Sequence, residues 1–189
     1  MKRILLILLL IPFLSFSQKT FVPDNIFEAW FEANGYGDSI PYNDSVTTSA
    51  ISAITSLSIE GFSISDLTGI EDIPNLHILN ARYNSLTNVD FSNNKNLYRL
   101  YLDYNQISQI TLPDSSHNNN NNPLELYLSD NILNSITFPQ TLRINRLGLV
   151  DNPLDSIDLS TLYDLYALSL KNSNLLTLDL SNNYNLHDI

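Results

Sequence analysis

A repeated apolar pattern constrains the fold of this chain more than any other feature. Four repeats are centred on asparagines that are separated by 21, 26 and 21 residues, namely Asn84, Asn105, Asn131 and Asn152. Apolar residues stand five and three positions before each asparagine, and two and five positions after it. The same frame holds around Phe62 and Ser173, where the central residue differs. Six repeats over four apolar columns indicate a solenoid.

The spacing of these columns predicts how each repeat folds. Leu100 and Leu102 stand two residues apart, so both point to the same side of a short strand. The later apolar positions point back into the same interior after the chain turns. One repeat cannot bury its apolar side alone, whereas stacked repeats bury it against their neighbours. We expect a parallel sheet about 30 Å long, since neighbouring strands lie about 4.8 Å apart.

The pattern L-x-x-L-x-L-x-x-N-x-L resembles that of the leucine-rich-repeat family, from about Ile51 to the end of the chain. The resemblance implies a leucine-rich-repeat solenoid with a curved parallel β-sheet on the concave side, an irregular convex side and a short N-terminal helical cap. Some segments resemble secreted bacterial members with internalin-like repeats; these are 21–27, 35–38, 64–71, 89–94 and 178–183. We therefore expect a cap region over 18–50, and six repeats plus a truncated seventh over 51–189.

The family resemblance also implies a structural role for the central asparagines. It predicts a ladder of side chains that bond backbone groups at the strand ends, formed by Asn84, Asn105, Asn131 and Asn152. A side-chain amide has two N–H donors and an acceptor, so it satisfies polar backbone that a turn leaves unpaired. Phe62 and Ser173 depart from the ladder. A terminal repeat is expected to be atypical, and the Ser173 hydroxyl can replace part of the amide.

The segment from Pro23 to Gly35 predicts a short amphipathic helix that covers the first repeat. Asp24 or Asn25 can cap its start, and Gly35 suits its end. Its apolar face consists of Ile26, Phe27, Trp30 and Phe31. The end of a solenoid exposes its core, so we interpret these side chains as part of a lid rather than as a ligand site.

The first 17 residues have the layout of a secretory signal peptide. Lys2 and Arg3 precede a largely apolar run over residues 4–16, and Ser15 and Ser17 supply small residues before a cut at Gln18. The run is too short to span a bilayer, which disfavours a membrane anchor. We expect residues 1–17 to be removed. The remaining chain is then secreted or displayed at the cell surface, without membrane insertion.

Composition disfavours several classes of partner. The formal net charge is −11, and removal of Lys2 and Arg3 leaves 7 basic against 20 acidic residues, or −13. Nucleic acids and anionic membranes bind clustered lysines and arginines, so neither is expected as a partner. The chain has no cysteine, and its stability must therefore come from packing without disulfides.

The sequence offers no catalytic or cofactor-binding motif. The histidines stand at no metal-ligand spacing, and neither a P-loop nor a G-x-S-x-G motif is present. Aspartates recur at one repeat position, before an apolar residue and a serine, at Asp90, Asp158 and Asp179. Calcium binding is one interpretation, but capping of a turn by a short carboxylate is favoured. We expect no enzymatic activity, no metal and no cofactor.

Outward-facing residues of the predicted concave sheet remain as a candidate binding site. They include Arg82, Tyr83, Arg99, Tyr101, Asp103, Tyr104 and Tyr127. Tyrosine and arginine dominate interface energetics, although tyrosine also favours strands for structural reasons. The favoured function is a non-catalytic scaffold that binds a protein or glycan ligand, for example in adhesion. The alternative is a structural or surface-display segment of a longer secreted protein whose function lies in a further C-terminal region.

Two features interrupt or end the repeats. Deletion of the run Asn118–Asn122 would restore the 21-residue spacing, so we interpret the run as a loop bulge rather than a recognition element. The residues from Leu186 onward begin a seventh turn. An uncapped sixth repeat would expose Leu168, Leu170 and Leu175 along an open strand edge. We therefore expect a piece of a longer solenoid, or self-association through this C-terminal end.

Overall fold

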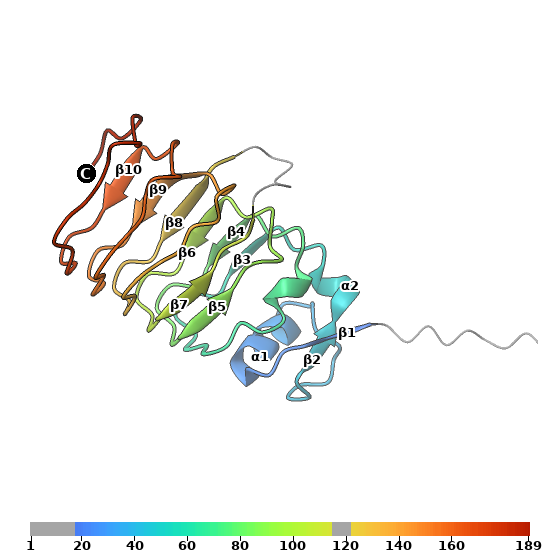
Figure 1. Ribbon diagram of the computed structural model, residues 1–189. Coiled ribbons are helices and arrows are strands. Elements are labelled where there is room, and N and C mark those ends of the chain that lie inside the picture. The colour runs from blue at the N-terminus through green and yellow to red at the C-terminus, as the bar shows by residue number, and fades with distance from the viewer. Residues whose placement is uncertain (1–17, 115–121) are drawn as a thin grey trace, which may run out of the picture.

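Successive turns of the chain stack to form one parallel sheet. The computed structural model describes residues 18–114 and 122–189, so the expected signal peptide and Asn118–Asn121 lie outside the described residues. Six strands follow one another across the sheet in chain order (Figure 1). They are β3 (Ser56–Ser58), β4 (Ile78–Asn80), β6 (Arg99–Tyr101), β8 (Leu124–Tyr127), β9 (Ile144–Gly148) and β10 (Ala167–Ser169). The predicted solenoid is confirmed.

The register of this sheet matches the alignment of the sequence repeats. Leu79 partners Leu57 on one side and Leu100 on the other. The same column continues through Leu126, Leu147 and Leu168. Each of these six leucines is at most 2% exposed. Because equivalent positions of adjacent repeats lie side by side, the core is a stack of apolar rows.

Most of the predicted apolar columns lie in this core. The structure buries every one of the twenty-four positions except Ile110, Ile157, Leu170, Leu175 and Leu178. The first four of these are partly buried against the same core, whereas Leu178 is 39% exposed. Burial therefore decreases along the last described turn, which packs against a complete turn on one side only.

A second parallel sheet forms on the return path of two turns. Its strands are β5 (Asn88–Asp90) and β7 (Gln109–Thr111), with Val89 beside Ile110. Val89 is buried and Ile110 partly buried against the same core as the leucines of the larger sheet. The core therefore lies between the two sheets, and part of the convex side, which the sequence predicts to be irregular, is regular strand.

The N-terminal region contains the predicted helix, α1 (Asn25–Ala33). Asp24 Oδ1 caps it by accepting from the backbone N–H groups of Ile26 and Phe27 at 2.9 and 3.0 Å. Phe27 and Phe31 are fully buried, with ring centroids 4.6 Å apart, and Trp30 is partly buried. Ile26 is 42% exposed, so its expected burial is wrong. It lies about 100° around the helix from the buried stripe.

A strand pair completes this cap. β1 (Lys19–Phe21) pairs antiparallel with β2 (Ser45–Thr47), and the short helix α2 (Thr48–Ile51) follows. Glu28 on α1 is fully buried, and its carboxylate accepts from the backbone N–H groups of Asn43 and Asp44 at 3.0 and 3.2 Å. A helix carboxylate therefore fixes the loop that leads into β2, a contact that apolar periodicity does not reveal.

The cap contacts the first repeat closely at Gly69, which precedes the 3₁₀ helix η1 (Ile70–Asp72). A Cβ atom at Gly69 would lie 2.8 Å from Val22 Cγ2 and 2.9 Å from the Phe21 carbonyl oxygen. The backbone φ of Gly69 is also 103°, a value that side-chain-bearing residues rarely adopt. Glycine is thus required both for space and for backbone geometry where the cap meets the repeats.

The four central asparagines are buried and join adjacent turns. Asn105 illustrates the arrangement, because its Nδ2 donates to the carbonyl oxygens of Ala81 and Leu102, each at 3.0 Å. Its Oδ1 accepts from the N–H of Leu86 in the preceding turn at 3.1 Å. Equivalent bonds are made by Asn84, Asn131 and Asn152. Each amide thus satisfies buried backbone in two consecutive turns.

A second set of buried asparagines lies on the other side of the core and was missed by the sequence analysis. Asn94 Nδ2 donates to the carbonyl oxygens of Ile70 and Ile73 at 2.8 and 3.1 Å. Asn183 Nδ2 bonds Leu159 and Leu162 in the same way. These residues stand outside the four apolar columns, so only the partial repeat of an Asn-Asn pair at 93–94 and 182–183 could have signalled them.

The recurring aspartates cap turns, as predicted. Asp90, Asp158 and Asp179 each accept through Oδ1 from the backbone N–H two residues later, at 2.8 to 2.9 Å. The donors are Ser92, Ser160 and Ser181. Hydrogen bonds from the hydroxyl and backbone N–H of Ser160 lower the pKa of Asp158 below its ordinary value, and those of Ser181 lower the pKa of Asp179 in the same way.

The expected exposure of the sixth repeat is wrong for its first leucine. Leu168 is 1% exposed, while Leu170 and Leu175 are partly buried against the core. The residues that begin the seventh turn explain this burial, because the Leu168 N–H donates to the Asp188 carbonyl at 2.9 Å and Ala167 pairs with Asp188. This short segment therefore covers the edge of β10.

The ladder makes a quantitative prediction for stability. Asn105→Ala leaves buried backbone groups of two turns without partners and should lower the free energy of unfolding by about 3 kcal/mol or more. Asn96→Ala is a matched control, because Asn96 is only partly buried and donates a single bond to the Pro74 carbonyl. Its cost should stay below about 1 kcal/mol. Urea denaturation followed by circular dichroism measures both, and equal costs would contradict the structural role of the ladder.

Candidate ligand-binding face

The outer face of the large sheet carries a stack of aromatic and cationic side chains. Tyr101 on β6 and Tyr127 on β8 are register partners, and their rings stack with centroids 5.1 Å apart and planes 13° apart. The Arg82 guanidinium lies over the Tyr101 ring, 4.3 Å from its centroid. A cation at this distance from an aromatic face is attracted by the ring quadrupole. Three neighbouring turns therefore contribute to one ordered column.

Asp103 holds Arg82 in this position. Its Oδ2 accepts from Arg82 Nε at 2.7 Å, and its Oδ1 accepts from the Ser129 backbone N–H at 2.9 Å. Asp103 is only 7% exposed. Asp103 was predicted as a ligand-binding residue, and both of its carboxylate oxygens are engaged within the protein. Asp103 orients the Arg82 guanidinium and accepts a hydrogen bond from the backbone of the following turn.

Tyr83 and Tyr104 form a second stacked pair beside this column. Their ring centroids are 4.4 Å apart with planes 7° apart, and the residues are 52% and 47% exposed. Both have a left-handed backbone, with φ values of 55° and 58°. That conformation is unusual for an aromatic residue and costs on the order of 1 kcal/mol. The protein thus retains two strained, exposed tyrosines where glycine or asparagine would be accommodated more easily.

The position of these tyrosines follows from the asparagine ladder. The residue just before each ladder position has a positive φ in every turn: Gly61, Tyr83, Tyr104, Asp130, Asp151 and Asn172. In the four turns that carry a ladder asparagine, this bend directs its side chain into the core, whereas Phe62, which follows Gly61, is 47% exposed. The same bend leaves the preceding side chain in solvent. The sheet face is therefore bordered by a row of residues that the turns must expose.

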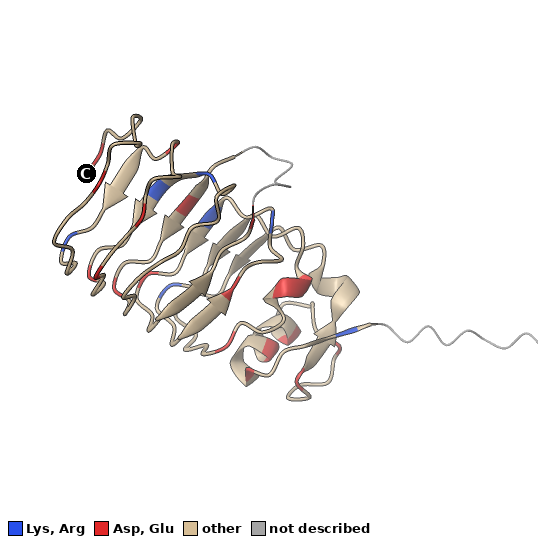
Figure 2. Ribbon diagram, in the orientation of Figure 1, with Lys and Arg blue, Asp and Glu red and all other residues tan. Residues whose placement is uncertain are grey.

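Charged side chains alternate along a third row of the face. Arg99 on β6 bonds Glu125 on β8 at 3.2 Å, and Glu125 is the register partner of Arg146 on β9. Figure 2 shows this alternation of basic and acidic residues across the three strands. The Glu125 carboxylate raises the pKa of Arg99. Arg99 is therefore turned toward Glu125 rather than into the tyrosine stack that Arg82 joins.

Three residues of this face were not among the predicted binding residues, although the repeat frame places one of them, Glu125, on the outward side. Glu125 and Arg146 complete the charged row, and the Arg146 guanidinium lies 5.5 Å from the Tyr166 ring. Gly148 partners Tyr127, whose Cδ1 would lie 3.3 Å from a Cβ atom at that position. The absence of a side chain therefore lets the Tyr127 ring lean over the backbone of β9. Column alignment of the repeats could have identified all three.

Two phenols of this face, those of Tyr104 and Tyr127, have pKa values raised above the ordinary value. Burial, followed by the Glu125 carboxylate, raises the pKa of Tyr127 above its ordinary value. The nearby Asp130 carboxylate raises the pKa of Tyr104. Neutral phenols donate hydrogen bonds as well as accept them. The face thus combines aromatic planes, hydroxyl donors and a fixed guanidinium.

The structure resembles the leucine-rich-repeat solenoids of internalins. An internalin from Listeria monocytogenes, InlF, is 23% identical over 89% of this chain and 56% of its own, with a TM-score of 0.53. The functional domain of InlJ from the same organism, which includes a cysteine ladder, is 23% identical over 92% of this chain and 47% of its own, with a TM-score of 0.45. No protein-family model and no curated protein matches the sequence. The chain spans about half the length of these internalins, and the likeness is one of fold.

The engagement of Asp103 leads to a stability prediction. Asp103→Ala removes the acceptor of the Ser129 N–H and of Arg82, and should lower the free energy of unfolding by about 2 kcal/mol. Asp103→Asn retains an oxygen for Ser129 and should cost about half as much. Chemical denaturation of the two variants provides the comparison. An Asp103→Ala variant as stable as the parent would return this carboxylate to the candidate ligand-binding groups.

Proposed function

We propose that this chain is a non-catalytic, extracytoplasmic scaffold that binds a protein or glycan ligand through the outer face of its large sheet. The binding residues are Arg82, Tyr83, Arg99, Tyr101, Tyr104 and Tyr127. The signal-like sequence of residues 1–17 supports export. Within residues 18–114 and 122–189, no helix is long and apolar enough to cross a membrane.

The observation that carries this proposal is the preformed order of the face. Arg82 is fixed by Asp103 at 2.7 Å and lies on Tyr101, which stacks on Tyr127. Side chains that are ordered before binding lose little rotamer entropy when a ligand arrives. Tyrosine and arginine are also the residues enriched among those that contribute most to binding. Planar rings with hydroxyl donors suit a sugar ring or a peptide backbone equally well.

A structural or surface-display role is the second candidate, and one observation favours it. Aromatic rings also pair between neighbouring turns outside the two tyrosine pairs: Tyr166 and His187 stack at 5.0 Å, and His77 and Tyr98 lie tilted at 5.8 Å. Cross-strand aromatic pairs stabilise a sheet without any ligand. A test of function must therefore separate loss of binding from loss of stability.

The left-handed tyrosines provide that separation. Asparagine tolerates a positive φ, so the double variant Tyr83→Asn with Tyr104→Asn should relieve backbone strain while it removes the stacked pair. Its free energy of unfolding should stay within about 1 kcal/mol of the parent. Binding to immobilised glycans and extracellular matrix proteins should fall at least tenfold, a loss of about 1.4 kcal/mol.

Tyr163→Asn with Tyr184→Asn is the matched control, because these tyrosines are 59% and 81% exposed but lie outside the stacked columns. The control should bind as the parent does. Equal binding by both double variants, or binding to none of the immobilised ligands, would support the structural role instead.

A further inference from the structure

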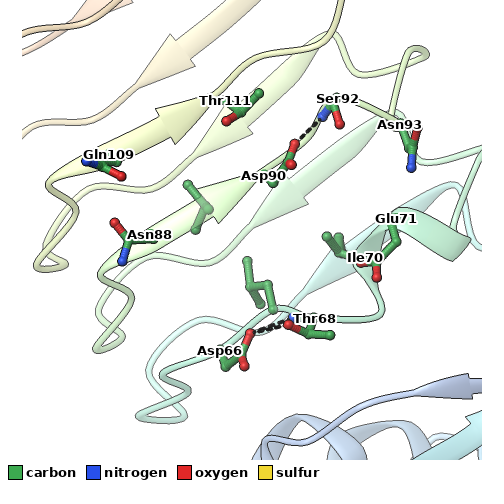
Figure 3. Close-up of a pocket in the computed structure, with 12 residues that line it drawn as sticks. Asp66, Thr68, Ile70, Glu71, Asn88, Asp90, Ser92, Asn93, Gln109 and Thr111 are labelled. Carbon is green, nitrogen blue, oxygen red and sulfur yellow. Dashed lines mark hydrogen bonds between the residues drawn. The ribbon is translucent and has the colours of Figure 1, made fainter.

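A groove lies on the other side of the molecule from the tyrosine stack, between the first and second turns. Its volume is about 590 Å³, within the range of roughly 300–1,000 Å³ that is usual for ligand sites. β5 lines one side together with Gln109 and Thr111 of β7, and the segment from Asp66 to Glu71 lines the other (Figure 3). This groove is separate from the face to which the proposed function is assigned.

The edge of β5 is open toward this groove. The Phe91 N–H donates to the Thr111 carbonyl at 2.9 Å, and Val89 partners Ile110, so these positions bond toward β7. Backbone groups of a strand alternate in direction, which turns those of Asn88 and Asp90 toward the first turn. Among the described residues, no residue of the first turn bonds the backbone of Asn88 or Asp90. A strand edge with free donors and acceptors therefore borders the groove.

Hydrogen bonds between the first two turns, one before the groove and one after it along the chain, set the length of this open edge. The Ser85 N–H donates to the Ile64 carbonyl at 2.9 Å, which joins the two turns before the groove begins. Asn94 Nδ2 donates to the Ile70 carbonyl at 2.8 Å, which joins them again after it. The next pair of turns has no such gap, because β5 and β7 pair over this region. The groove thus runs along one edge of the two-stranded β5–β7 sheet.

Asp24 bonds the segment of the first turn that lies opposite β5. While its Oδ1 caps α1, its Oδ2 accepts from the Ser65 N–H at 2.8 Å, the Ser65 hydroxyl at 3.0 Å and the Asp66 N–H at 3.2 Å. Ser65 and Asp66 are the repeat equivalents of Thr87 and Asn88, which lead into β5. The cap therefore fixes this segment of the first turn. Burial raises the pKa of Asp24, but these hydrogen bonds outweigh it and the pKa is lowered overall.

The lining selects the kind of chain that fits this edge. Leu67, Ile70 and Val89 form an apolar floor and are each at most 6% exposed. Three carboxylates, of Asp66, Glu71 and Asp90, stand around it, and the described residues that line the groove include no lysine, arginine or histidine. Figure 3 shows Asp66 and Asp90 on opposite walls. Alternate side chains of an added strand would face the apolar floor and the carboxylates.

We propose that an extended segment of a partner polypeptide binds here as an added strand on β5, with basic side chains toward Asp66, Glu71 and Asp90. Main-chain hydrogen bonds to Asn88 and Asp90 supply affinity, as in other cases of strand addition to an open sheet edge. The carboxylates select lysine or arginine at alternate positions, and the floor accepts a small apolar residue between them. This site is independent of the ligand assigned to the tyrosine face.

The test uses an acetylated, amidated heptapeptide that alternates lysine with valine, titrated into the isotopically labelled chain. The backbone amide signals of Asn88 and Asp90 should shift, and their hydrogen exchange should slow. The same peptide with N-methylated amides along one edge should lose binding, because it cannot pair with β5. A peptide with glutamate in place of lysine should bind at least tenfold more weakly.

Protein variants localise the effect. Asp66→Asn with Glu71→Gln retains the oxygens that accept from Thr68 and Gly69 and should weaken peptide binding at least tenfold. Asp151→Asn with Asp155→Asn removes the same charge from exposed residues of a distant turn and should leave binding unchanged. Asp24→Asn keeps one oxygen for the helix cap but loses the acceptor of Ser65, and should weaken binding by releasing the first turn.

Three outcomes would overturn the proposal. One is the absence of any shift at Asn88 and Asp90 at millimolar peptide. Another is binding that N-methylation leaves unchanged, which would mean charge attraction without strand pairing. The third is equal weakening by the groove variant and the distant charge control. Circular dichroism of each variant establishes folding, and the N-methylated peptide tests the proposal on the unaltered protein.

Discussion

Hydrogen bonding by buried asparagines is the interaction on which the rest of this structure depends. Each repeat must bend between its strand and its return path, and the bend leaves polar backbone inside an apolar core. An unpaired buried backbone group costs about 1–3 kcal/mol, so six turns could not stack without partners for these groups. Asn84, Asn105, Asn131 and Asn152 supply them and connect each turn to the one before. The chain has no cysteine, so no disulfide joins neighbouring turns.

The ladder also determines what the surface presents. The bend that sends Asn84 and Asn105 inward gives Tyr83 and Tyr104 a left-handed backbone and leaves both rings exposed. In-phase stacking of the turns then brings equal repeat positions together, which stacks Tyr101 on Tyr127. Asp24 fixes the first turn at Ser65 and Asp66, beside the groove that borders β5. The order of the tyrosine face therefore follows from the in-phase stacking of the turns.

The sequence predicted those features that repeat and missed those that depend on single long-range contacts. The apolar columns, the solenoid and the capping role of Asp90 follow from local spacing. The hydrogen bond between Arg82 and Asp103 does not follow from local spacing, because a repeat position on the outer face gives no sign of its partner in the preceding turn. Burial of Leu168 depends on pairing with Asp188, which lies 20 residues away. The contact between Asp24 and Ser65 spans 41 residues and leaves no periodic trace.

Hydrogen exchange of the backbone amides that donate to the ladder asparagines tests this account most directly. The backbone N–H groups of Ile64, Leu86, Ile107 and Leu133 lie in turns, outside every strand, yet each donates to an asparagine Oδ1. We predict that these amides exchange as slowly as those at the centre of the large sheet, through unfolding of the solenoid. Rapid exchange of these four amides, at rates typical of open turns, would contradict the claim that the asparagine ladder holds the turns together.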